Sequence, residues 1–140
     1  WVTGDNGTIL KTIDGGVNWV SQLTDTSTYI SSAFFTDSLT GWAVGESGTI
    51  LSSADGGMNW LTQHSGTKFF LNSVQFFDKQ TGWAAGDGGT ILKTTNGGAK
   101  WNYEISNTTN DLSSLNFIDN STGWAVGQWG TIINTIQTSK

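Results

Sequence analysis

The chain has 140 residues, enough for one domain with a buried core, and it carries a formal net charge of −5 with six lysines and no arginine. Without arginine, neither nucleic-acid binding nor bidentate recognition of phosphate or carboxylate groups is expected. Cysteine is absent, which excludes disulfides and thiolate metal sites, and no apolar run is long enough for membrane insertion.

The sequence is organised as a repeat of 41 residues without insertions or deletions. Tryptophan recurs at one position of every repeat, at Trp1, Trp42, Trp83 and Trp124. The segment Gly-Thr-Ile-Leu recurs in the same way at Gly7, Gly48 and Gly89, and as Gly-Thr-Ile-Ile at Gly130. In chain order, this pattern predicts a partial unit over residues 1–30, full units over 31–71 and 72–112, and a partial unit over 113–140.

Each full unit contains four short β-prone runs separated by turn residues, and we name these runs strands A to D. The first unit starts at strand B, and the last unit contains strands A, B and C. In the second unit the predicted strands cover residues 32–35, 41–45 and 48–53 and the short run around Trp60. Gly, Asp and Asn between these runs are typical of tight turns with positive φ.

Four antiparallel strands in about 41 residues is the length of one blade of a β-propeller. A single four-stranded sheet cannot bury both of its faces, so neighbouring sheets must stack. We therefore expect an all-β chain of about 3.4 blades, with the strand B tryptophans packed between blades. Because propellers close with more blades than this, we expect either further sequence, the favoured alternative, or self-association to complete the ring.

The turn between strands C and D has the form Ser/Thr-x-Asp/Asn-x-Gly-x-x-Trp in three units. Its residues are Asp14, Gly16 and Trp19, then Asp55, Gly57 and Trp60, then Asn96, Gly98 and Trp101. This turn resembles the Asp-box, or bacterial neuraminidase repeat. We expect its side-chain oxygen to accept backbone N–H groups of its own turn, its glycine to allow a left-handed step and its tryptophan to seal the hairpin, which are structural roles. In the fourth unit Gln137 stands in place of the Asp.

Together with Gly-Trp-Ala-Val-Gly and Gly-Thr-Ile-Leu, this turn makes the whole chain resemble the photosystem II assembly and stability factor family of propellers. The resemblance implies a non-catalytic binding or scaffold role. Photosynthetic members are seven-bladed scaffolds that bind a membrane-protein subunit through an arginine-rich patch, and this chain has no arginine to form one. Bacterial relatives carry similar blades as secreted or surface modules, so we expect an extracellular or periplasmic module and not a photosystem assembly factor.

Because successive strands alternate in direction, the B–C turns and D–A connections are expected on one rim, and the A–B and C–D turns on the other. On the first rim, the B–C turns place acidic residues at equivalent positions, at Asp5, Glu46 and Asp87. Trp129 in the fourth B–C turn is a candidate ligand contact, with packing against an adjacent loop or a missing blade as the stronger alternative. The D–A connections vary most between units, as binding loops do, and contribute His64, Lys68, Phe69 and Tyr103.

The expected function is non-catalytic binding of a protein or a carbohydrate on the B–C/D–A rim. The alternative is a segment of an Asp-box glycoside hydrolase similar to sialidases or xyloglucanases. Sialidases hold the substrate carboxylate with three arginines, which are absent here, and only Asp25, Glu104 and Asp111 fall outside the repeat pattern as candidate catalytic acids. Because His64 is the single histidine, no multi-histidine metal site is expected, and no motif indicates a cofactor.

Overall fold

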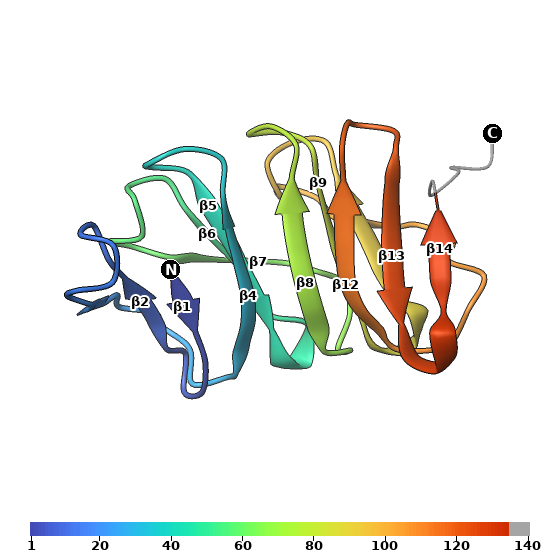
Figure 1. Cartoon of the computed structure of the whole chain (residues 1–140), viewed down its shortest axis with the longest axis horizontal. Coiled ribbons are helices and arrows are strands. Elements are labelled where there is room, and N and C mark those ends of the chain that lie inside the picture. The colour runs from blue at the N-terminus through green and yellow to red at the C-terminus, as the bar shows by residue number, and fades with distance from the viewer. Residues whose placement is uncertain (135–140) are drawn as a thin grey trace.

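The computed structural model describes residues 1–134 as four antiparallel sheets placed side by side along the molecule (Figure 1). The first sheet contains β1 (Val2–Thr3), β2 (Ile9–Lys11) and β3 (Val20–Ser21). The second contains β4 (Ile30–Phe35), β5 (Gly41–Gly45), β6 (Ile50–Ser53) and β7 (Leu61–Gln63). The third contains β8 (Leu71–Phe76), β9 (Gly82–Gly86), β10 (Ile91–Thr94) and β11 (Asn102–Tyr103). The fourth contains β12 (Leu112–Phe117), β13 (Gly123–Gly127) and β14 (Ile132–Asn134), and Gln137 lies outside the described residues.

Within each sheet the strands follow one another in chain order, and all neighbouring strands are antiparallel. Each A strand contacts the A strand of the next blade directly, β4 with β8 and β8 with β12, as Figure 1 shows, whereas the outer strands β3, β7 and β11 make no comparable contact. Sheets that approach at one edge and diverge at the other are the blades of a propeller. The predicted all-β propeller fold is confirmed. In residues 1–134 no helix is long and apolar enough to cross a membrane.

The two glycines of the Gly-Trp-Ala-Val-Gly motif are required by close contacts inside each blade. A Cβ on Gly82 would lie 2.6 Å from the ring of Phe76, which covers this glycine from the neighbouring strand A. A Cβ on Gly86 would collide with the backbone carbonyl of Phe70. The motif therefore lets an aromatic ring lie flat on strand B at one end and lets the D–A connection approach it at the other.

The strand B tryptophan of one blade stacks on the strand A phenylalanine of the next blade. Trp42 and Phe76 have ring centroids 3.5 Å apart with an interplanar angle of 9°, and the Trp42 Nε1 donates a hydrogen bond to Gly97 O at 3.1 Å. Trp101 of the C–D turn completes the group by meeting the edge of Phe76. Trp83 makes the equivalent stack on Phe117 across the next interface. These aromatic groups form the core between blades.

The expectation that all repeated tryptophans are buried is correct only in the second and third blades, which have a blade on each side. Trp42 is 2% exposed, but Trp124 is 39% exposed and has no stacked aromatic partner in the described chain. Trp1 stacks on Phe35 at 4.0 Å and is still 37% exposed, because its own sheet has no strand A in this chain. Trp19 is also exposed, whereas the equivalent C–D tryptophans of the next two blades are buried. In each case strand D starts one residue after this tryptophan, which belongs to the turn.

Polar side chains join the A strands at the inner edge of the sheets. The Gln75 side chain accepts a hydrogen bond from Phe117 N at 2.6 Å and donates one to Phe117 O at 2.9 Å, so it extends backbone pairing from one blade to the next. Asn72 donates to Leu112 O across the same interface, and Ser31 donates to Leu71 O across the preceding one. The relative position of neighbouring blades is therefore determined by specific hydrogen bonds between their A strands as well as by apolar packing.

Candidate protein-binding rim

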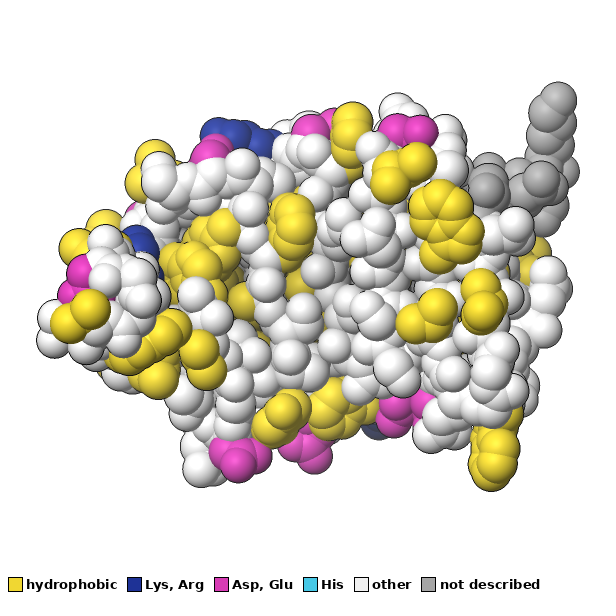
Figure 2. Space-filling view, viewed as in Figure 1, with side chains coloured by type: hydrophobic (Ala, Val, Ile, Leu, Met, Phe, Trp, Pro, Cys, Tyr) yellow, Lys and Arg dark blue, Asp and Glu magenta, His cyan; other side chains and the backbone are white. Residues whose placement is uncertain are grey.

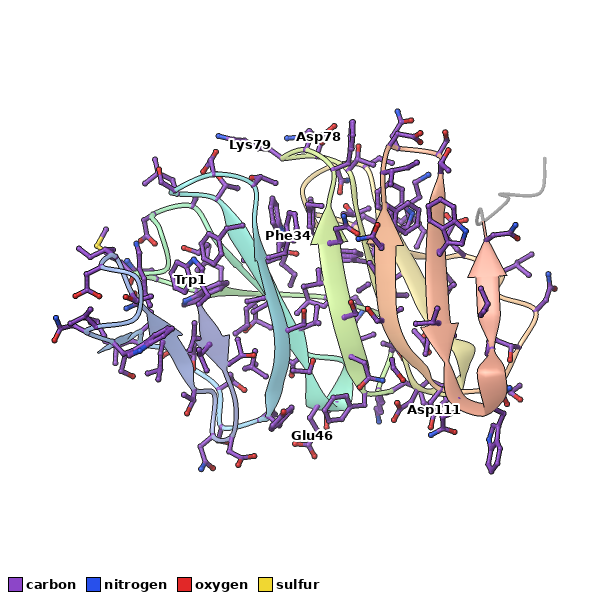
Figure 3. All side chains as sticks on the ribbon, in the orientation of Figure 1. Trp1, Phe34, Glu46, Asp78, Lys79 and Asp111 are labelled. Carbon is purple, nitrogen blue, oxygen red and sulfur yellow. The ribbon has the colours of Figure 1, made fainter. Side chains whose placement is uncertain are left out.

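The structure places the turns on two opposite rims, as the strand directions predict. Glu46 and Asp111 lie on one rim, at the lower edge of Figure 3, and Asp78 and Lys79 lie on the other. On the first rim the B–C turns are single 3₁₀ turns, η1 (Glu46–Gly48), η2 (Asp87–Gly89) and η3 (Gln128–Gly130). The middle residue of each has positive φ, from 57° to 62°, and Asn6 at 54° takes the same place in the first blade.

The B–C turns of the second, third and fourth blades are each tied by their backbone to the end of the D–A connection that leads into the same blade. The amide of Glu46 donates to Tyr29 O, that of Asp87 to Phe70 O and that of Gln128 to Asp111 O, each at 2.9 Å. Backbone bonds hold these positions whatever side chain they carry. The rim therefore presents variable side chains, among them Tyr29 and Phe70, on a constant frame.

The rim carboxylates differ in how they are held. Asp5 and Glu46 are exposed, and no side-chain hydrogen bond holds either of them in the structure. Asp87 accepts a hydrogen bond from Asn72 Nδ2 at 2.9 Å, and the same amide nitrogen bonds to the next blade. Asp111 accepts one from Gly88 N at 2.9 Å, so it links the third blade to the connection that enters the fourth. The structure thus divides the acidic row into two free carboxylates and two that brace neighbouring blades.

Four aromatic side chains are exposed on the same rim. Trp129 is 88% exposed at the tip of its turn and packs against no loop of the described chain, while its packing against a further blade stays a prediction. Phe69 is 54% exposed, and its ring lies beside Gly88. Tyr103 is exposed, with its hydroxyl 3.5 Å from Gly66 O, and Tyr29 packs at a tilt against Phe70 with a centroid distance of 5.8 Å. Acidic and hydrophobic side chains adjoin along the lower edge in Figure 2.

His64 and Lys68 are exposed residues of the D–A connection between the second and third blades. His64 follows β7 directly, at the outer end of this connection, and Lys68 precedes Phe69 near its inner end. Neither makes a side-chain hydrogen bond or ion pair within the described residues. The 41-residue repeat predicts the rim positions of the acidic residues and of Trp129. It does not by itself identify Tyr29 and Asn72 as rim residues, although Tyr29 is equivalent to Phe70 in the repeat spacing.

On the opposite rim the polar side chains of the C–D turns form hydrogen bonds within their own turns. Asp14 Oδ1 accepts a hydrogen bond from Asn18 N at 2.9 Å, and its Oδ2 accepts one from Asn18 Nδ2 at 2.7 Å. The backbone bond is the main reason that the pKa of Asp14 is lowered to about 2. Asn96 makes the equivalent bond to Lys100 N without a charge. The adjacent A–B turns are closed in the same manner by Asp37, Asp78 and Asp119.

The acids outside the repeat pattern occupy unlike surroundings. Glu104 follows β11, the outermost strand of its sheet, where partial burial raises its pKa in spite of nearby Lys93. Asp111 lies at the inner end of the same connection, against Gly88. Asp25 is exposed in the first D–A connection. In the described residues no three of the His, Asp and Glu side chains gather as metal ligands would.

The architecture and the repeated motifs agree with one family. A family model described as "Photosynthesis system II assembly factor YCF48" matches residues 22–108 and 61–136. The chain belongs to this family.

Two solved structures of the YCF48 family resemble the chain. One, described as "YCF48 bound to D1 peptide", is 27% identical with a TM-score of 0.73, over 85% of this chain and 39% of that one. YCF48 from Cyanidioschyzon merolae is 20% identical with a TM-score of 0.78, over 93% of this chain and 44% of that one, and this likeness shows the fold alone. The chain thus spans less than half the length of either relative. A comparison with curated proteins found no match.

Proposed function

We propose that this chain is a non-catalytic, protein-binding part of a YCF48-family propeller, and that its partner docks on the B–C/D–A rim. The observation that carries the proposal is the exposure of Trp129, Phe69 and Tyr103 on a backbone-fixed frame, on the same rim as free carboxylates. Large exposed aromatics on a rigid scaffold are typical of protein-binding surfaces, where they supply most of the binding energy. The family relative described as bound to a D1 peptide supports a polypeptide as the ligand.

Recognition on this rim proceeds without arginine. Aromatic contacts from Trp129 and Phe69 supply the apolar centre of the interface, and Asp5 and Glu46 supply charge at its margin. Asp87 and Asp111 act indirectly, because their hydrogen bonds hold neighbouring blades in register. His64 and Lys68 contribute the polar outer part. The proposed setting is extracellular or periplasmic, as for the bacterial relatives that carry similar blades, and fractionation of the source cells tests it.

The test is capture of a partner from an extract of the source organism, followed by affinity measurements on variants. We expect Trp129→Ala and Phe69→Ala each to weaken binding by about 30-fold, the effect of losing an interface hot spot. Phe77→Ala is the matched control, because Phe77 is 50% exposed on the opposite rim. Unchanged affinity in both rim variants, or a loss confined to Phe77→Ala, contradicts the proposed face. Selective binding on a glycan array, with no protein captured, contradicts the proposed partner class.

A further inference from the structure

One position of strand C carries a lysine in the first and third units and a serine in the second. These residues are Lys11 on β2, Ser52 on β6 and Lys93 on β10, each 41 residues from the next. In the register of the sheets, Ser52 lies opposite Trp42 and Lys93 lies opposite Trp83. The three residues therefore occupy the same place between a strand B tryptophan and the neighbouring blade.

The two lysines show what this place accommodates. The Lys11 ammonium lies 5.2 Å from the centroid of the Trp1 ring and donates a hydrogen bond to Gly56 O of the next blade at 2.9 Å. The Lys93 ammonium lies 5.2 Å from the centroid of the Trp83 ring. An alkyl chain on the tryptophan with a cation at its end is a favourable arrangement, and it occurs in the first and third units.

Between the second and third blades the serine leaves this place open. A crevice of about 440 Å³ lies there, lined by Trp42, Ser52, Asp55, Asn59, Leu61 and Lys79, among others. Its volume is within the range of small-ligand pockets, about 300–1,000 Å³. Since Ser52 has only a hydroxymethyl group, it cannot fill the space that the lysine chain takes in the neighbouring units.

The charges around the crevice favour a cation. Hydrogen bonds from Asn59 hold the pKa of Asp55 below its ordinary value, so this carboxylate stays ionised. Lys79, the basic residue of the lining, forms an ion pair with Asp37 at 2.6 Å, which balances its charge. Gly97 O already accepts hydrogen bonds from Trp42 Nε1 and Gln63 Nε2. Asp55 Oδ1 likewise accepts hydrogen bonds from Ser53 Oγ and Asn59 N, whereas Asp55 Oδ2 accepts one, from Asn59 Nδ2. The acceptors left for a bound ammonium are therefore Asp55 Oδ2, the side-chain oxygen of Asn59 and the Ser52 hydroxyl.

We propose that the crevice between the second and third blades binds a primary alkylammonium group. Its chain lies against Trp42, as the side chains of Lys11 and Lys93 lie against Trp1 and Trp83, and its charge lies beside Asp55. The ligand is the side chain of a lysine from another protein or a free alkylamine. This site lies on the rim of the A–B and C–D turns, opposite the proposed docking rim. The proposed ammonium site is therefore independent of the proposed function and is tested separately.

Indole N–H resonances of the ¹⁵N-labelled protein test the proposal in titrations with three probes. The probes are n-butylamine, Nα-acetyl-lysine methylamide and the same compound acetylated on Nε, each to about 20 mM, a range that detects millimolar affinity. We expect the Trp42 indole signal to shift with the two amines, and binding of the Nε-acetylated compound to be about tenfold weaker, because its charge is lost. Equal affinity for the two amines would show that an alkylammonium group alone is sufficient for binding. Tighter binding of the lysine amide would show that the ligand is a lysine side chain of a polypeptide.

The variant Ser52→Lys places the chain's own lysine in the crevice. We expect it to abolish the Trp42 shift at an unchanged or raised melting temperature, while the control Ser27→Lys, which adds the same charge on the opposite rim, binds as the parent protein does. Equal affinity for the acetylated probe, shifts that bypass Trp42, or undiminished binding by folded Ser52→Lys would each overturn the proposal.

Discussion

The contribution of the stack between blades is tested by replacing Trp42 with alanine. The side chain is 2% exposed, stacks on Phe76 at 3.5 Å and donates a hydrogen bond to Gly97 O. Truncating a buried tryptophan to alanine costs about 3–5 kcal/mol, a large part of the total stability of about 5–15 kcal/mol of a domain. With a urea m-value of about 2 kcal/mol/M, a loss of about 4 kcal/mol lowers the unfolding midpoint by about 2 M.

The matched control is Trp124→Ala, at the same repeat position but 39% exposed and without a stacked partner in the described chain. We expect this variant to lose only about 1 kcal/mol. Trp42→Phe keeps the ring stack and leaves Gly97 O bonded to Gln63, so it should lose about 1–2 kcal/mol. Urea unfolding followed by circular dichroism measures all three. Equal losses for Trp42→Ala and Trp124→Ala would refute the conclusion that the next blade determines the energy of this tryptophan.

Three further predictions follow from repeat-equivalent positions and from the turn carboxylates. Gly45→Ala should lower the free energy of unfolding by about 1–3 kcal/mol because its Cβ would meet Tyr29 O. Gly4→Ala, whose Cβ would have nothing within 4 Å, should change the free energy of unfolding in urea little. Equal losses in the two variants would contradict the close-contact explanation. Gln75→Ala should cost about 2 kcal/mol because it leaves the Phe117 backbone amide unpaired, and exposed Asn116→Ala less than about 0.5 kcal/mol, again by urea unfolding. Because the folded pKa of Asp14 is about 2 and its ordinary value 3.8, its stabilisation is present above about pH 4 and is lost as the pH falls toward 2. Asp14→Asn, which caps as Asn96 does, should therefore have a melting temperature that falls less steeply over that range, and an unchanged slope would contradict the assignment.

The local structure of each blade could be predicted from the sequence because short-range forces determine it. Gly-Trp-Ala-Val-Gly and Gly-Thr-Ile-Leu are strands bounded by turn residues, and Asp14 or Asn96 closes its turn through bonds to residues four positions away. The 41-residue spacing then predicts sheets of equal length that must stack. The family resemblance rests on the same local signals, which is why it was recognisable before any packing was known.

The sequence also predicted which turns share a rim, since alternating strand direction alone places the B–C turns beside the D–A connections. It did not show which rim side chains are free. Asp5 and Asp87 are equivalent in the repeat, yet only Asp87 is held by Asn72, because the residue that reaches it comes from another strand. Trp129 was ambiguous for the same reason, since exposure depends on what lies across from a turn.

What the sequence by itself determined is the unit: four strands, their turns and the period at which they recur. Only the tertiary structure decided how far identical side chains at equivalent positions of the repeat are buried. Trp42 is buried and Trp124 is not, although both occupy the same position of strand B. The physical reason is that burial and cavity volume depend on the neighbouring sheet, and no property of one repeat specifies what packs against it.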